Sequence, residues 1–420
     1  MRATVPERKG RFAALQSRNF TLLWLGLIVS NAGTWMQNVA NGWLVLQLTN
    51  SPLWLGLLGL SFALPMMVLP LVGGAVVDRV HRIKLLYITQ TASMLVAFAL
   101  AILTWLGLVS VWHIFAASFL GAALLAFDNP ARQALMPELV PPGDLLNALS
   151  LNSATYNGAA LIGPALAGAM LAPLGAGTLY FLNGISFVAV IFALIGMKDV
   201  RAHGGGKPGS LRSSMGEGLV YAWSNRLVFV LLMLSALAAF FGRSYQTLLP
   251  IFARDIWRAG PEGYGVLLSA GGAGALVGAF GLAAVSNLKR RALVLIASGL
   301  LGAAALMVFA LSPGFIPGIG LLFVASIATT VFGTMIATTI QLSIPNEMRG
   351  RVMSLYAITL IGLPSLGALG VGSAAEFLGG ISGAPRAVLA GAAIMGVVLV
   401  VFARYVSKHV PQGAPERMRR

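Results

Sequence analysis

Long apolar runs recur along this sequence, and they constrain its fold more than any other feature. The runs 20–48 and 85–108 are each long enough to cross about 30 Å of hydrocarbon as a helix. Only 10% of the 420 residues are charged and 58% are hydrophobic, which is too little polarity to cover a soluble protein of this size. The sequence therefore predicts an all-α integral membrane protein whose chain crosses the bilayer many times.

Apolar stretches bounded by charges, Pro or Gly divide the chain into twelve predicted transmembrane helices. Their approximate limits are 20–47, 53–77, 85–107, 111–136, 145–172, 176–197, 227–252, 264–285, 292–312, 317–343, 352–378 and 385–405. Gly and Pro occur freely inside them, which membrane helices tolerate because neighbouring helices satisfy the freed backbone groups.

One long polar stretch, 198–226, separates the first six spans from the last six. Its three consecutive glycines, 204–206, and Pro208 are typical of a flexible linker. We therefore predict a tail over 1–18, a six-helix bundle over 19–197, a linker over 198–226, a second six-helix bundle over 227–406 and a tail over 407–420. Two pseudo-symmetric six-helix bundles with a cavity between them are the plan of a transporter.

Most of the 28 Lys and Arg residues fall in the two tails, the linker and the even-numbered connections between spans. The odd-numbered connections hold Arg254, Arg258 and Arg386. Lys and Arg collect on the cytoplasmic side of membrane proteins, so both termini are predicted to be cytoplasmic. The net charge of +16 then reflects topology, and no nucleic-acid partner is expected.

Side chains that carry enzymatic chemistry are sparse in the spans. The chain has no cysteine, and its histidines do not pair at metal-ligand spacing: His81, His113, His203 and His409. Neither HExxH nor GxSxG occurs. We therefore expect no metal site, no cofactor and no enzymatic activity.

The string GAVVDRVHRIK at 74–84 follows the second predicted span. It resembles the loop 2–3 signature of the major facilitator superfamily, G-x-x-x-D-R-x-G-R-R/K, with His81 and Ile83 as departures from that pattern. The glycine lets two helices approach closely, and the arginines can bridge to acids on a neighbouring helix. The resemblance implies a major facilitator fold with a cytoplasmic gate that includes Gly74, Asp78, Arg79 and Arg82.

A glycine-rich face in the fifth span contains Gly158, Gly163, Pro164 and Gly168. It resembles the antiporter signature of the same superfamily, and ordinary small-residue packing is the alternative. The strings at 18–37, 128–137 and 345–352 are similar to the drug/proton antiporter branch, which includes the enterobactin exporter and macrolide efflux proteins. The resemblance covers essentially the whole chain and implies proton-coupled export.

Of the twelve acids, Asp128 and Glu376 are the two that fall inside predicted spans. A charge at the centre of a membrane helix costs at least about 2.5–3.5 kcal/mol, so both are candidates for proton coupling. Arg132 lies four residues after Asp128, on the same helix face. We hypothesise a cytoplasmic lock of Asp78, Arg82, Asp128 and Arg132. Asp78 would face the start of the eleventh span near 351–354, and Glu347 and Arg351 are further candidates for the gate. Static stabilisation by Asp128 and a solvated helix end at Glu376 remain open alternatives.

The first span carries polar residues on one face, at Asn31, Thr34, Asn38 and Asn41. Polar and aromatic residues on cavity-lining helices suit amphipathic organic ligands. The candidate substrate cavity therefore contains Asn31, Trp35, Asn38, Tyr156, Arg243 and Tyr245. Hydrogen bonding between helices is the alternative for the polar groups, and for Arg243 the alternatives are a partner in Glu376 or an outward-reaching side chain.

These patterns favour one function among several. We expect a secondary transporter that exports a small organic compound, a drug-like molecule or a siderophore, by proton antiport through alternating access. An importer, uniporter or lysophospholipid carrier of the same fold is the alternative. The expected partners are the substrate, protons and the lipid bilayer. The protein is expected to be a monomer in a bacterial plasma (inner) membrane.

Overall fold

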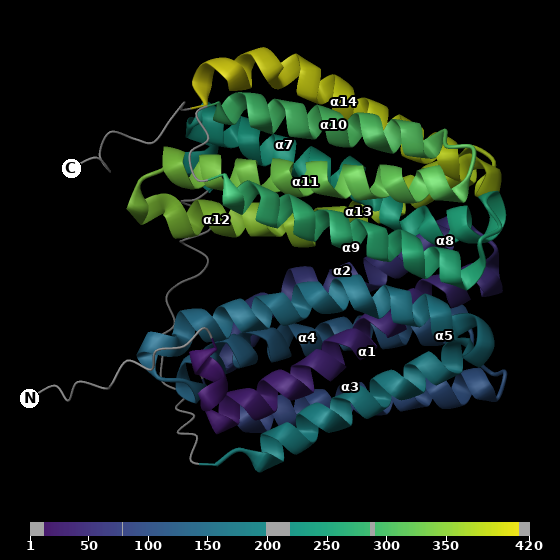
Figure 1. Cartoon of the computed structure of the whole chain (residues 1–420), viewed down its shortest axis with the longest axis vertical. Helices are drawn as coiled ribbons and strands as arrows, with labels where there is room; N and C mark the ends of the chain where they lie inside the picture. The colour runs from purple at the N-terminus through teal and green to yellow at the C-terminus, as the bar shows by residue number, and fades with distance from the viewer. Residues whose placement is uncertain (1–11, 78, 199–218, 286–289, 411–420) are drawn as a thin grey trace, which may run out of the picture. The chain divides into compact units, whose positions relative to one another are not determined.

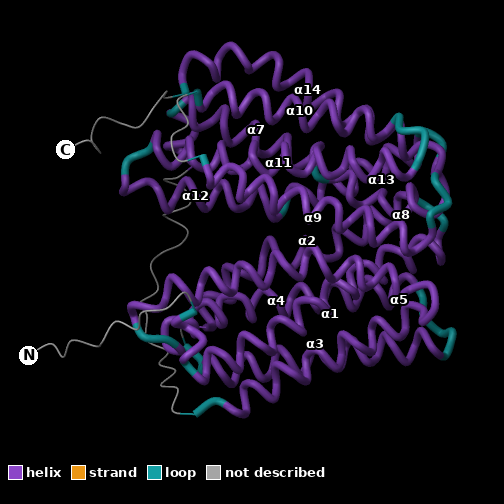
Figure 2. The backbone as a smooth tube through the Cα atoms, viewed as in Figure 1, coloured by secondary structure: helices purple, strands orange, loops and turns teal. Residues whose placement is uncertain are grey.

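Figure 1 shows a computed structural model of the chain, which describes residues 12–77, 79–198, 219–285 and 290–410. Residues 70–75 and 361 are described by their backbone alone. Every regular element in these ranges is a helix (Figure 2). Asp78 and most of the predicted linker lie outside the described residues, as do most of both predicted tails.

The first half of the sequence contains five long helices. Their bounds are α1 (Arg18–Thr49), α2 (Pro52–Val77), α3 (Arg82–Trp105), α4 (Val111–Leu139) and α5 (Leu145–Gly196). Short 3-10 turns precede α1 and α5, at η1 (Ala13–Gln16) and η2 (Pro142–Asp144). The 52 residues of α5 are two helices joined at Gly175, whose φ of 72° and ψ of 168° leave the helical region. Glycine adopts a positive φ because it has no Cβ, so the chain turns there, between two predicted spans.

The second half is more interrupted. Its elements are α7 (Arg226–Gly242), η3 (Ser244–Leu248), α8 (Leu249–Ile251), η4 (Phe252–Ile256), α9 (Gly260–Ala284), α10 (Arg291–Ala310), α11 (Phe315–Ser343), α12 (Asn346–Ile361), α13 (Leu363–Phe377), η5 (Gly380–Gly383) and α14 (Ala384–His409). The seventh and eleventh predicted spans each contain a break. Pro250 and Pro364 lie just after these breaks, and proline removes a helix hydrogen bond and clashes with the carbonyl four residues earlier.

Ten helical segments among the described residues are long and apolar enough to cross a membrane. One of them, Pro142–Gly196, has 55 residues and contains two of the predicted spans. The 32-residue α1 is not among the ten, because its polar residues lower its hydropathy. Large apolar side chains are exposed along the helices, such as Phe192, Phe280 and Val401, as expected where lipid covers them. The all-helical membrane fold is confirmed.

The chain divides into two compact units. The first contains residues 1–41 and 64–208, and the second contains residues 42–63 and 209–420. The adjoining ends of α1 and α2 therefore belong to the second unit. In the first unit α3 packs beside α5 and α4, around a core that includes Leu27, Leu135 and Leu194. In the second unit α11 packs beside α9 and α10 (Figure 1), around a core that includes Leu231, Leu295 and Phe332.

Candidate functional site

A buried carboxylate forms a polar cluster inside the first unit. Asp128 of α4 is 2% exposed, and its Oδ1 accepts hydrogen bonds from the Thr89 hydroxyl (3.0 Å) and from Gln90 Nε2 (2.7 Å) of α3. Its other oxygen accepts a hydrogen bond from the guanidinium of Arg132, one helical turn further along α4. Asp128 thus has a counter-ion and two neutral donors, which together offset the cost of removing its charge from water.

Thr89 and Gln90 were not predicted as site residues. The signal that could have found them is the run Thr89-Gln90-Thr91, three polar residues inside an otherwise apolar span. Buried polar groups need partners, so this run indicated a polar group on a neighbouring helix.

A second ion pair joins α3 to α4 at the predicted cytoplasmic end. Arg82, the first residue of α3, bonds the Glu138 carboxylate and donates to the Ala134 carbonyl at 3.2 Å. The hypothesis placed Arg82 in a lock with Asp128, and in this structure its partner is Glu138 instead. The reason is distance along α4: Glu138 lies ten residues after Asp128, close to the end of α4 and level with the start of α3.

The remaining predicted gate residues are not members of these two pairs. Arg79 is exposed, and Gly74 lies in the part of α2 where only the backbone is described. In the second unit, Glu347 is exposed in the first turn of α12. Arg351, one turn further on, is half-buried and bonds Met348 Sδ at 3.4 Å.

The glycine-rich face of α5 includes one position of close helix contact. A Cβ added to Gly163 would lie 2.6 Å from Trp35 Cβ and 3.3 Å from the Ala32 carbonyl oxygen of α1. Pro164 and Gly168 are buried beside it, whereas Gly158 has no such neighbour within 4 Å. Gly163 therefore allows α1 and α5 to touch in the first unit.

The predicted cavity residues of the first unit gather on α1 and α5. Asn38 and Tyr156 are exposed, whereas Asn31 and Trp35 are half-buried. The Trp35 and Tyr156 rings are neighbours, with centroids 6.4 Å apart. A different α1 side chain, Gln37, accepts a hydrogen bond of 2.6 Å from Asn183 of α5. On α1, Gln37 thus bonds to a neighbouring helix, whereas the Asn38 side chain is exposed.

The two predicted cavity residues of the second unit have different surroundings. Arg243 is exposed at the end of α7. Tyr245, two residues later, is 5% exposed and packs against Phe309 of α10, with ring centroids 6.3 Å apart. Tyr245 thus belongs to the packed interior of the second unit in this structure.

The turn between α1 and α2 is held by two charged residues of the second half. Glu376, at the end of α13, accepts hydrogen bonds from the Ser51 hydroxyl (2.7 Å) and the Leu53 backbone N–H (3.4 Å) at the start of α2. Arg254 of η4 donates to the Leu46 carbonyl at 3.0 Å and bonds the Asn50 side chain at the end of α1. An acid thus lies at a helix amino terminus and a base at a helix carboxyl terminus, which are the positions that the helix dipole favours.

Close backbone packing accompanies this contact. A Cβ on Gly56 of α2 would lie 2.7 Å from the Ala368 carbonyl oxygen of α13, and one on Gly372 would lie 2.6 Å from the Pro52 carbonyl oxygen. Glycines at both positions let α2 and α13 approach closely. The prediction gave Glu376 as a proton site, a solvated helix end or a partner of Arg243, and the charge-matched turn was not visible in the sequence.

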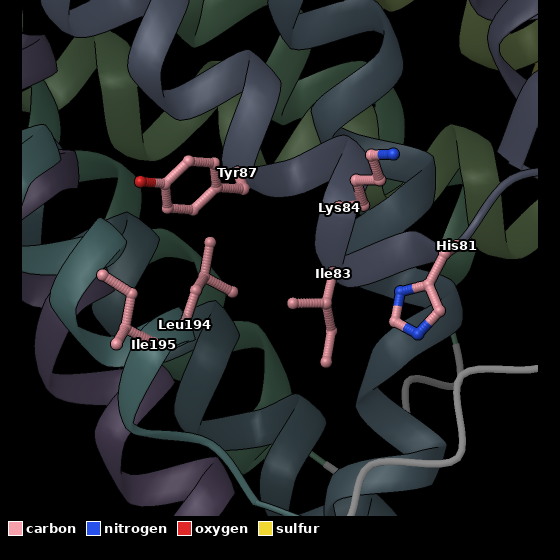
Figure 3. Close-up of a pocket in the computed structure, with 6 residues that line it drawn as sticks. All are labelled: His81, Ile83, Lys84, Tyr87, Leu194 and Ile195. Atoms are coloured by element: carbon pink, nitrogen blue, oxygen red, sulfur yellow. The ribbon is translucent and has the colours of Figure 1, made fainter.

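An open groove of about 510 Å³ lies at the predicted cytoplasmic end of the first unit (Figure 3). Its lining residues come from the start of α3 and the end of α5: His81, Ile83, Lys84, Tyr87, Leu194 and Ile195. None of the predicted substrate-cavity residues lines it. Among the residues that the structure describes, no cluster of His, Cys, Asp and Glu could hold a metal ion.

Comparison with known proteins places the chain in a family. Residues 9–416 match the transmembrane secretion effector family. The multidrug efflux pump Tap of Mycolicibacterium fortuitum is 27% identical over 376 residues, 85% of this chain and 89% of the relative. Macrolide efflux protein A of Streptococcus pyogenes is 25% identical over 360 residues, which cover 80% and 84% of the two chains. The staphyloferrin A transporter of Staphylococcus aureus is 26% identical over 245 residues, 56% of this chain and 60% of the relative.

Solved structures show the same fold. A bacterial homolog of the human lysosomal transporter Spinster matches with a TM-score of 0.73 at 14% identity, covering 94% of this chain and 97% of the other. The nucleoside transporter NupG matches with a TM-score of 0.72 at 13% identity, covering 93% and 99%. The predicted major facilitator fold is therefore confirmed. The chain is a multi-pass membrane transporter of the major facilitator superfamily, not an enzyme, and it belongs to the transmembrane secretion effector family.

Proposed function

We propose that this transporter exports a small amphipathic organic compound in exchange for protons, by alternating access in a bacterial plasma membrane. Both termini would lie in the cytoplasm, and the monomer would be the working unit. The observation that carries the proposal is Asp128, a carboxylate that is 2% exposed in a membrane helix and paired with Arg132. An ionisable group inside the membrane is a candidate proton site, because burying its charge there is costly and such residues are usually kept for a function. The relatives named as efflux pumps support the direction of transport.

The proposed cytoplasmic gate is built around the start of α3. The Arg82–Glu138 pair holds α3 to α4 there, and Asp128, paired with Arg132 on α4, accepts hydrogen bonds from α3. Asp78 and Arg79 follow Gly74 in the connection from α2, and Glu347 and Arg351 begin α12 in the second half. The proposal is that Asp128 exchanges a proton when the gate opens, which frees Arg132 to change partner.

Glu376 is the second candidate for proton coupling. It lies on the predicted outer end, where its carboxylate holds the start of α2. A protonated carboxyl has no charge to interact with the helix dipole, so proton entry from outside would weaken this contact. Proton binding and opening of the outer end would then be linked.

Transport in everted membrane vesicles tests the proposal. A substrate that is exchanged for protons should dissipate a preformed pH gradient, and Asp128→Asn should abolish the response while Glu262→Gln, an acid in the first turn of α9, should not. Amphipathic cations, neutral macrocycles, organic anions and lysophospholipids would form the panel. Accumulation that does not move protons would instead indicate a uniporter, and movement out of everted vesicles would indicate an importer.

A further inference from the structure

The seventh span is interrupted close to its middle. The α-helix α7 ends at Gly242, and the chain continues through the 3-10 turn η3 and the π-helical segment η4 before the span ends at Ile256. Pro250 forces part of this change, because it has no N–H to offer and clashes with the Gln246 carbonyl. The break leaves Arg243 at the carboxyl end of α7, at the junction between two types of helix.

Arg243 lies too deep to belong to either end of the span. The whole span runs from Arg226 to Ile256, and Arg243 directly follows α7, about 25 Å from the start of that helix at Arg226. Its side chain is exposed, although α7 between Val230 and Gly242 presents no other exposed residue. A charge at this depth needs a partner or a water-filled cavity.

The described residues supply no such partner. No hydrogen bond or ion pair engages the Arg243 guanidinium among them. The described acids of the second unit have other places. Asp255 pairs with Arg254, and Glu376 bonds Ser51 and Leu53. Glu262 and Glu347 lie in the first turns of α9 and α12. The alternative in which Glu376 neutralises Arg243 is therefore not realised in this structure.

Polar groups of α7, α11 and α12 near Arg243 bond one another and not its guanidinium. Ser235 of α7 and Thr359 of α12 are joined by a hydrogen bond of 2.8 Å, which ties the two helices together. Tyr356, close enough to Arg243 for an electrostatic interaction, donates its hydroxyl to the Gly333 carbonyl of α11 at 2.9 Å. Gln246, three residues after Arg243, is also exposed and can donate from its amide.

We propose that Arg243 binds an anionic group of the substrate, so that the transported compound is an organic anion. This inference rests on the proposed transport function and names its substrate class. The planar guanidinium presents paired N–H donors that match a carboxylate, and binding compensates the charge that the protein leaves unpaired. A cationic amphipath is disfavoured at the same place by like-charge repulsion.

The experiment measures binding, so it does not depend on the direction or coupling of transport. Purified full-length protein in detergent is titrated calorimetrically with three compounds that share one ring system: 1-naphthoate, the neutral 1-naphthamide and the cationic 1-naphthylmethylamine. The variants are Arg243→Gln, Arg243→Lys and the control Arg404→Gln, which removes an exposed arginine near the end of α14. Thermal unfolding without ligand shows that each variant is folded.

Wild-type protein should bind the carboxylate more tightly than the amide or the amine. Arg243→Gln should lose about 10- to 100-fold of the carboxylate affinity, the range for a hydrogen-bonded charge pair, and keep its amide affinity. Arg243→Lys should retain part of the affinity, because it keeps the charge without the planar fork. Arg404→Gln should match the wild type.

Two results would overturn the inference. One is that the wild-type protein binds the amide or the amine at least as tightly as the carboxylate, or does not bind the carboxylate at all. The other is Arg243→Gln with undiminished carboxylate affinity, which would mean that the side chain only reaches outward to the membrane surface. If carboxylate binding depends on Arg243 but vesicles show no proton exchange, the proposed coupling fails and the substrate class stands.

Discussion

Glu376 accepts a hydrogen bond of 2.7 Å from the hydroxyl of Ser51, 325 residues earlier in the chain. Ser51 directly precedes α2, and the same carboxylate oxygen also accepts from the Leu53 backbone N–H. A residue that ends one helix thus caps the start of another. Arg254 does the converse at the end of α1. The short turn between α1 and α2 is therefore gripped at both of its ends by opposite charges.

Replacing Glu376 with Gln should loosen this turn. The carboxylate charge stabilises the start of α2 by about 0.3–1 kcal/mol, so its loss should raise the population of the loosened turn roughly two- to fivefold. The chain has no cysteine, so Ala368→Cys, which is 4% exposed in α13 beside Gly56, provides a single reporter. Its alkylation by a membrane-impermeant thiol reagent should be faster in Glu376→Gln and unchanged in Glu262→Gln. Equal rates in all three backgrounds would contradict a holding role for Glu376.

Arg254 offers a test of the same turn by stability. Arg254→Gln removes the bond to the Leu46 carbonyl and leaves Asp255 without its partner, 3.0 Å away. We expect a loss of roughly 1 kcal/mol, as for charges at helix ends and partly exposed pairs. The double variant Arg254→Gln/Asp255→Asn should recover part of it in thermal unfolding. A double variant as unstable as the single one would assign the whole effect to the α1 contact.

Gly163 and Gly158 form a matched pair on α5. Alanine at 163 would place its Cβ 2.6 Å from Trp35 Cβ, whereas alanine at 158 has no such neighbour within 4 Å. Overpacking of this kind costs about 1–3 kcal/mol, and alanine is otherwise the better helix former. Gly163→Ala should therefore unfold at a lower temperature than the wild type, and Gly158→Ala at the same temperature or above. Equal effects at both positions would mean that α1 and α5 do not pack tightly through Gly163.

A double replacement separates structure from coupling at Asp128. Asp128→Asn leaves Arg132 as an uncompensated charge, which destabilises a buried pair by about 3–5 kcal/mol. Adding Arg132→Gln should restore most of the stability, because Asn can still accept from Thr89 and Gln90. Proton-coupled transport should stay lost in the double variant. Recovery of transport together with stability would show that Asp128 has a purely structural role.

The features that the sequence predicts well are local. The apolar runs determine the helices, and the four-residue spacing of Asp128 and Arg132 brings these two side chains into an ion pair on one helix. The position of the turn near 173–175 also follows from the residues there, since Gly175 takes the positive φ. Each of these depends on neighbours in the sequence, so its geometry is set before any helix meets another.

The features that sequence reasoning missed depend on how helices rotate and slide against each other. Arg82 and Glu138 are 56 residues apart, and their meeting requires the start of α3 to lie level with the end of α4. Whether Tyr245 faces a cavity or a core likewise depends on the break in α7, and in the structure its ring lies against Phe309. A periodic pattern fixes which residues share a face, but it does not say which neighbour that face meets.

The second compact unit takes residues 42–63 from the first half of the sequence, so a cut at the linker separates this segment from the helices that it packs with. A fragment ending at Pro208 would carry Val45, Leu46 and Leu55 on this hairpin, all buried in the whole chain, without the helices that cover them. The complementary fragment, which starts at Gly209, would lack residues 42–63 of its own compact unit. If the two fragments were produced together from separate genes, the hairpin of the first would pack against the helices of the second, and this contact would join them.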